Sequence, residues 1–159
     1  MNTKTLAIGI GGFVAGLALM AILGFYSLPG MMMLEDESKY GFDETVEVFK
    51  TEVEEAGWSV LQVHDMKSIL ARHGHDVKNV QIFELCSSQY SAEILKLDDE
   101  RIVSPLMPCR IAIYEKSNGN TYITRMDSKR MARPFGGVIN EVMQKAAVDT
   151  EEIIAQILR

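Results

Sequence analysis

The first pattern along the chain is an apolar run near its start. Residues 6–28 read LAIGIGGFVAGLALMAILGFYSL, which is 23 residues without a charge. A helix of this length spans about 34 Å, enough to cross the hydrocarbon core of a bilayer. Phe25 and Tyr26 lie where interfacial aromatic residues occur, and Pro29-Gly30 is expected to end the helix. The run therefore predicts a transmembrane helix over 6–28, preceded by a short cytoplasmic segment at 1–5.

A cleaved secretory signal is the alternative interpretation of this run. We favour an uncleaved anchor, because the run is longer than the usual hydrophobic region of a signal and no clean Ala-x-Ala precedes a polar start. Lys4 decides the orientation, since the acidic residues at 35–37 count little in the positive-inside rule. We expect a single-pass protein of the inner membrane, with its N-terminus in the cytoplasm and its domain outside, which in a bacterium is the periplasm.

The anchor also contains a GxxxG spacing, from Gly12 to Gly16. Such spacing lets two helix backbones approach closely in a membrane, which predicts a homodimer. Glycine is common in membrane helices, so mere composition is the alternative explanation.

Beyond the anchor, alternating and helical patterns follow one another. Val46, Phe49 and Val53 share one face of a helix that begins at an Asp43 N-cap and ends at Gly57. Asn118-Gly119 is a strong hairpin signal, because both residues tolerate positive φ. Strands are predicted at 31–37, 58–63, 80–85, 109–114 and 121–126.

The remaining segments are predicted as helices and one long loop. Ser87 or Ser88 caps a helix that runs to about residue 95, and Asp149 starts a separate last helix. Further helices are predicted at 66–72 and 138–147, and a loop at 98–107. This order of elements predicts one α+β domain over 31–159, with an antiparallel sheet.

The net charge of this domain limits the kinds of partner that it can bind. After residue 34, 22 acidic residues face 15 basic ones, which leaves a net charge of −7. Nucleic-acid binding needs clustered Lys and Arg, so we expect no nucleic-acid partner. The sequence has no His-activated nucleophile, glycine-rich phosphate loop or paired-carboxylate spacing, and we therefore nominate no catalytic residue.

The two cysteines are the main candidate site. Cys86 ends one predicted strand and Cys109 begins the next long one, so antiparallel pairing can bring the two thiols together. One interpretation is a disulfide, stabilising by about 3 kcal/mol. A second is two unlinked thiols that pack like small hydrophobic residues. A third is a redox, metal or ligand site in which Arg110 lowers a thiolate pKa.

Soft-metal binding is a further alternative. Met107, Met126 and Met131 lie near Cys109 and could form a copper-type site with it, although methionine more commonly fills a core. His64, His73 and His75 are better explained as solvated side chains. We therefore assign no metal site, and the cofactor stays unknown.

Several stretches of the chain share a pattern with a known family. They are MMMLEDESKYGFDETVEVFK, EEAGWSVLQVHDMK, VQIFELCSSQYSAEIL, LMPCRIAIYEKSNGNTYITRMD and AAVDTEEIIAQIL. Together they resemble the family called domain of unknown function 302 (DUF302). The Ser-x-Tyr-Gly-Phe-x-Glu-Thr-Val helix entry and the Pro-Cys before a hydrophobic strand are specific details. The resemblance implies a fold similar to the TATA-binding protein, with an antiparallel sheet and two main packing helices in β-α-β4-α order. It implies no activity, and it is compatible with a dimer.

These observations lead to one expectation and two alternatives. We expect a membrane-anchored, exported, non-enzymatic domain that binds a small ligand, a metal or a protein partner. The first alternative is a thiol redox or sulfur-handling protein that uses Cys86 and Cys109 with help from Arg110. The second is a soft-metal protein of the copper type.

Overall fold

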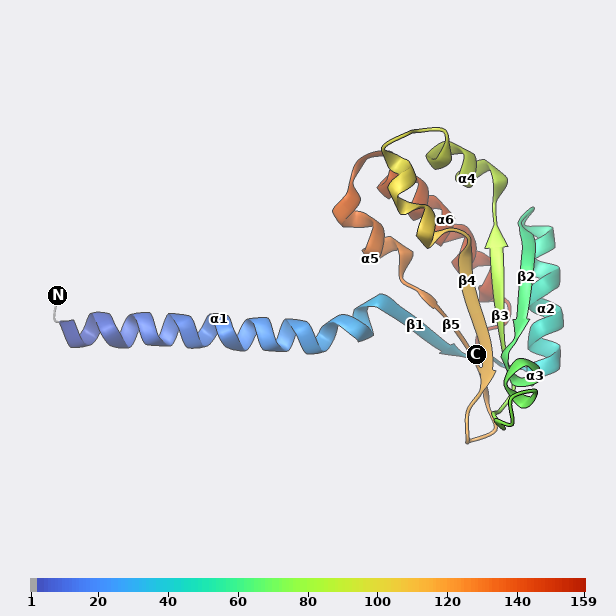
Figure 1. Cartoon of the computed structure of the whole chain (residues 1–159), viewed down its shortest axis with the longest axis horizontal. Helices are drawn as coiled ribbons and strands as arrows, with labels where there is room; N and C mark the ends of the chain where they lie inside the picture. Colours follow the sequence, from blue (N-terminus) through green and yellow to red (C-terminus); the bar gives the residue numbers. More distant parts are fainter. Residues whose placement is uncertain (1–2) are drawn as a thin grey trace.

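The N-terminal helix stands apart from the rest of the chain. The computed structural model describes residues 3–159, so part of the segment 1–5 lies outside the described residues. Helix α1 (Thr3–Met32) projects away from the domain (Figure 1), and its stretch Ile10–Ser27 is long and apolar enough to cross a membrane. A signal sequence near the N-terminus can also form a helix that is long and apolar enough to cross a membrane, so the helix is either an anchor or a signal.

The end of α1 differs from the prediction. The helix continues through Pro29-Gly30 to Met32, so the expectation that these two residues end it at 28 is wrong. Proline has no N–H to bond the carbonyl four residues earlier, but its fixed φ lies in the helical range, so the backbone can keep helical geometry beyond it. As a result the first strand begins at Met33 and follows the helix without a linker.

A five-stranded antiparallel sheet forms the centre of the domain and confirms the predicted α+β class. Its order is β1-β5-β4-β3-β2, and β4 and β5 form the predicted hairpin. The strands are β1 (Met33–Glu37), β2 (Ser59–Asp65), β3 (Val80–Cys86), β4 (Cys109–Glu115) and β5 (Thr121–Met126).

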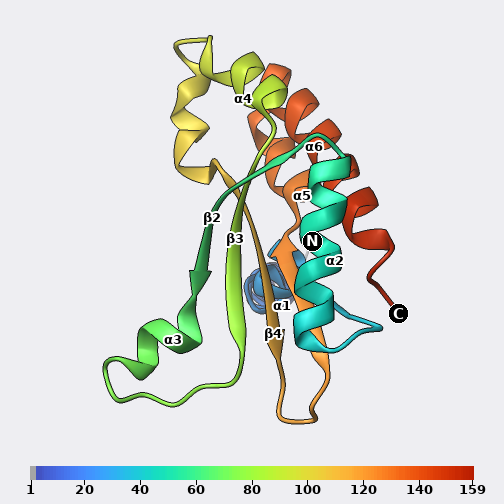
Figure 2. The same ribbon diagram turned by 90° about the vertical axis from the view of Figure 1, so that its right-hand side faces the viewer.

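Two long helices cover one face of this sheet, α2 (Phe42–Glu55) and α6 (Gly137–Ala155), and Figure 2 shows them on the same side. Shorter elements lie at the ends of the strands. They are α3 (Met66–Ala71), α4 (Ser88–Leu95), η1 (Glu100–Leu106), α5 (Ser128–Ala132) and η2 (Arg133–Phe135).

Three helix details correct the prediction. Asp149 does not start a new helix, because α6 runs continuously past it and its Oδ2 accepts a hydrogen bond from the Tyr90 hydroxyl on α4 (2.9 Å). The N-cap of α2 is Gly41, and Asp43 lies in the first turn, where its charge favours the helix dipole. The predicted loop at 98–107 contains η1.

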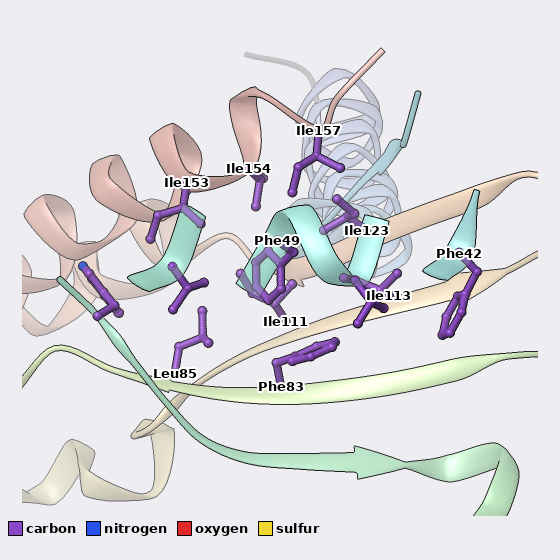
Figure 3. Packing of buried hydrophobic residues seen from close by; sticks show 13 residues of the cluster. Phe42, Phe49, Phe83, Leu85, Ile111, Ile113, Ile123, Ile153, Ile154 and Ile157 are labelled. Carbon is purple, nitrogen blue, oxygen red and sulfur yellow. The ribbon is translucent and has the colours of Figure 1, made fainter. Parts of the chain in front are cut away.

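The core lies between the sheet and the two long helices. Odd-numbered residues of β3, β4 and β5 point into it, and Phe83 meets Phe49 of α2 edge to face at 5.1 Å between ring centroids (Figure 3). The other main members are Leu85, Ile111, Ile113, Ile123, Ile153, Ile154 and Ile157. Among the residues whose side chains are described, every buried one lies between Ser38 and Ile157, so α1 adds nothing to this core.

Candidate functional site

A cavity of about 300 Å³ lies at the end of the sheet where β3 finishes and β4 begins. Figure 1 shows α4 and α6 gathered beside this end of the strands. The walls come from the sheet, α4, η1 and α6, and most of them are apolar. The apolar lining includes Leu85, Ile94, Val103, Leu106, Ile111 and Val142. Its size is at the lower end of cavities that hold small molecules.

The cavity lies between two clusters into which the buried apolar residues are divided. The main core ends near Leu85 and Cys109, and a second buried cluster joins Ile94, Val103 and Val142 from α4, η1 and α6. Because the short elements α4 and η1 cannot fill all the space beyond the strand ends, the gap between the clusters stays open. The cavity therefore occupies the boundary between two packed regions.

Cys109 lines this cavity from the core face of the sheet. It lies directly opposite Leu85 in the β3–β4 register, and burial, with a smaller effect from nearby Cys86, raises the pKa of its thiol. A raised pKa keeps the sulfur protonated and weakens it as a nucleophile. The chemistry of Cys109 in this setting is that of a small apolar side chain.

Cys86 also lines the cavity, but it is not the direct partner of Cys109. Because Cys109 pairs with Leu85, Cys86 lies diagonally from it, and its Sγ is 3.3 Å from the Ser91 hydroxyl on α4. Both cysteines are free thiols in the structure. The sequence thus correctly places the two residues at one end of the sheet, and the disulfide stays a prediction.

The guanidinium of Arg110 belongs to a different cluster. Strand neighbours point to opposite faces, so Arg110 points away from the face that holds Cys109. Its guanidinium donates to Glu84 Oε1 (3.1 and 3.2 Å), which also meets His64 Nε2 at 3.2 Å. Hydrogen bonding from His64 and then Arg110 lowers the pKa of Glu84. Arg110 is also among the residues that line the cavity, but the hydrogen bonds of its guanidinium go to Glu84, and its help to a Cys109 thiolate stays a prediction.

Arg125 is a site residue that the sequence analysis did not single out. Its side chain is only 6% exposed, yet it bonds Asp36 on β1 and Glu151 on α6. Nε and Nη2 donate to the two oxygens of Glu151 (2.9 and 2.5 Å), and Nη1 donates to Asp36 Oδ2 (2.5 Å). Burial opposes its charge, but the bonds to Glu151 and Asp36 outweigh that effect and raise the pKa of Arg125.

This arginine lies in the cavity wall with Glu151. Its charge is already balanced by two carboxylates, so it offers little attraction to an anionic ligand. The available signal in the sequence was a charged residue at an inward-facing position of a strand, which usually means a buried ion pair.

Sulfur is the other feature of the lining. Met107, Met126 and Met143 line the cavity together with the two cysteines, whereas Met131 is not among the lining residues. His73 and His75 are exposed in the turn after α3. Across the part of the chain that the structure describes, no three His, Cys, Asp or Glu residues are grouped to hold a metal ion.

The fold and this cavity define a small α+β domain with an apolar pocket at one end of an antiparallel sheet. The chain belongs to the family described as domain of unknown function DUF302, whose family model matches residues 34–159. The matched region begins just after α1, so the family accounts for the domain and not for the N-terminal helix.

The domain is similar to a solved structure. It is described as the crystal structure of the uncharacterized conserved protein DUF302 from Bacillus stearothermophilus, and its TM-score is 0.72. The two chains are 20% identical, and the likeness covers 80% of this chain and 98% of that one. At this identity the likeness shows the fold alone. A comparison with curated proteins finds no match to this chain.

Proposed function

We propose that this protein is a membrane-anchored module that binds a small, mainly apolar ligand in the cavity at the end of its sheet. The observation that carries the proposal is the cavity itself, with about 300 Å³ of space and mostly apolar walls. A few polar groups among apolar walls are typical of sites that bind small molecules. The protonated thiol of Cys109 and the paired charge of Arg125 favour a neutral ligand over an anion.

Anchoring is the second part of the proposal. Helix α1 supplies a membrane-spanning segment, and Lys4 favours an N-terminus on the cytoplasmic side. The domain is then exported, and the groups around its cavity suit holding a ligand rather than transferring protons. In α1, a side chain at Gly12 or Gly16 would meet no other atom within 4 Å, so this surface is free for a second copy of the helix. A homodimer stays a prediction.

The domain can be tested without α1. The family match starts at residue 34, and the similar solved structure consists almost entirely of this domain. The buried side chains from Ser38 onward form its core without help from α1. We call residues 33–159, which begin with β1, the head.

The test is binding of N-phenyl-1-naphthylamine, a neutral fluorescent probe, to the head. The fluorescence of the probe should rise with saturable binding. Ala146→Leu adds bulk to the cavity wall on α6 and should weaken binding about tenfold or more. Ala155→Leu makes the same change at an exposed position of the same helix and should leave binding unchanged. Equal binding by both variants would place the probe outside the cavity and overturn the proposal.

The sulfur-rich lining favours a second candidate function, the binding of a soft metal such as Cu(I). Thiol and thioether ligands select this ion, and two cysteines and three methionines line one cavity. Competition with bicinchoninate measures Cu(I) affinity. The metal function predicts that Cys86→Ser with Cys109→Ser abolishes Cu(I) binding, while the apolar-ligand function predicts that this variant still binds the fluorescent probe.

A further inference from the structure

We propose that the head docks on an anionic bilayer through a basic turn, defined as residues 128–135 in α5 and η2. This turn reads SKRMARPF and carries Lys129, Arg130 and Arg133 with no acidic residue. In a head with a net charge of −7, such a local concentration of positive charge stands out. The inference rests on the proposed anchor, because α1 must hold the head beside a membrane.

The fold places the basic turn beside the end of α1. The backbone N–H of Asp127, immediately before α5, donates to the Met32 carbonyl at the end of the helix (2.8 Å). In Figure 1, α5 and the turn after it form the part of the head that reaches back farthest along the α1 axis. When α1 spans a bilayer, this turn therefore lies level with the lipid headgroups.

The side chains of the basic turn suit a membrane surface. Arg133 is exposed, and in the described part of the chain neither Arg133 nor Lys129 takes part in an ion pair. Arg130 is 54% exposed and is partly neutralised by Asp127 (3.2 Å). Phe135 is 48% exposed at the end of the turn. Basic residues beside an exposed aromatic ring are typical of segments that lie in the membrane interface.

The size of the effect is consistent with docking of a tethered head. Each Lys or Arg near an anionic surface strengthens binding about fivefold. The anchor keeps the local concentration of the head high, so a few charges are enough to set its orientation. Docking would also turn one cavity wall toward the bilayer, because Asp127, Ser128 and Lys129 line the cavity. An apolar ligand could then enter from the lipid.

The test uses the full chain in nanodiscs that contain brominated phosphatidylcholine with or without phosphatidylglycerol. Phe135→Trp reports on the basic turn, and Ser117→Trp reports on the exposed β4–β5 turn. Trp58 is buried and gives a common background in both variants. With phosphatidylglycerol present, the brominated lipid should quench the tryptophan at position 135 and not that at position 117.

Neutralising the basic turn should undo this quenching. Lys129→Gln with Arg133→Gln should lower the ratio of docked to undocked heads about 30-fold. Arg72→Gln with Lys78→Gln removes the same charge at exposed positions after α3 and should change nothing. Omitting phosphatidylglycerol or raising the salt should act like the first double variant.

The outcomes separate the two proposals. A chain that fails to co-elute with the discs contradicts the anchor and removes the docking inference with it. A chain that inserts but gives equal quenching at positions 135 and 117 overturns the docking inference alone. Quenching that ignores phosphatidylglycerol, salt and the charge variants also overturns it, because the contact would then not depend on the basic residues.

Discussion

Arg125 joins three elements through one buried side chain. It links β5, which carries it, to β1 through Asp36 and to α6 through Glu151. Breaking a buried ion pair from one side is costly, because the remaining charges lose their partner. The two carboxylates here are partly exposed, which moderates the loss.

We predict that Arg125→Gln lowers the free energy of unfolding of the head by about 2–3 kcal/mol, measured by urea denaturation. The matched control is Arg110→Gln, the same substitution on the neighbouring strand, where the arginine is 60% exposed. Arg110 reaches Glu84 from the solvent side, and Glu84 keeps His64 as a second partner, so the loss there should stay below about 1 kcal/mol. Equal losses for the two variants would contradict the structural role assigned to Arg125.

The two cysteines should differ in reactivity. Burial raises the pKa of the Cys109 thiol, so at pH 8 it holds less of the reactive thiolate than an ordinary cysteine. We predict that iodoacetamide modifies Cys86 about tenfold faster than Cys109 in the folded head, as followed by peptide mass spectrometry. Faster modification of Cys109 would favour the thiol redox alternative. If neither cysteine reacts in the unfolded, unreduced chain, the predicted disulfide is present.

For individual residues, the sequence predicted where they lie along the strands but not which side chains they contact. Cys86 and Cys109 could be placed at one end of the sheet from strand boundaries alone. The exposed guanidinium of Arg110 agrees with strand alternation, which points the side chains of neighbouring strand residues to opposite faces of the sheet. The ion pairs of Arg125 could not be predicted, because Asp36 and Glu151 lie 89 and 26 residues away along the chain.

Among the elements, the β4–β5 hairpin was predicted most reliably, because its turn depends on local chemistry. Gly119 has φ +84°, and its N–H donates to the Lys116 carbonyl (3.0 Å). Asn118 accepts from the Asn120 N–H through its side chain (3.0 Å), which fixes the turn from within.

We predict that Gly119→Ala destabilises the head by about 1 kcal/mol, because alanine resists positive φ. An added Cβ would meet no atom within 4 Å, so the loss measures backbone conformation and not a clash. Gly119→Asn should cost less, since asparagine tolerates this conformation. Thermal melts of the two variants provide the comparison, and an equal loss in both would point to a cause other than φ.

Helix ends were predicted less well than helix positions. Asp149 resembles an N-cap in sequence, but a long-range bond to Tyr90 engages its carboxylate in the middle of α6. Pro29-Gly30 resembles a helix end, yet α1 continues for one more turn. In both places the local sequence predicted a helix boundary, but contacts or backbone geometry that appear only in the folded chain let the helix continue.

For the whole molecule, α1 and the head are expected to behave as separate units. We predict that the full chain stays in membranes through a carbonate wash, whereas the head made alone is released.

We also expect the intact mass of the membrane-bound protein to include α1, because an uncleaved anchor is proposed. A mature chain that begins after Pro29 would show instead that the helix is a signal.

The family resemblance predicted the fold of the head, but no pattern in the sequence indicated the cavity, which depends on how α4, η1 and α6 meet.

The direct passage from α1 into β1 has a mechanical consequence. Among the described strands, β1 lies at the sheet edge and pairs along its length with β5 alone. Near its end, residues 158 and 159 also hold it, through the Ser38–Leu158 bridge and a hydrogen bond from the Arg159 N–H to the Glu37 carbonyl. If α1 anchors the head in a membrane as proposed, a pull between membrane and head travels along β1 and loads its hydrogen bonds to β5 in shear, all at once rather than one by one. The tether therefore enters the domain along a direction in which an antiparallel pair resists tension well.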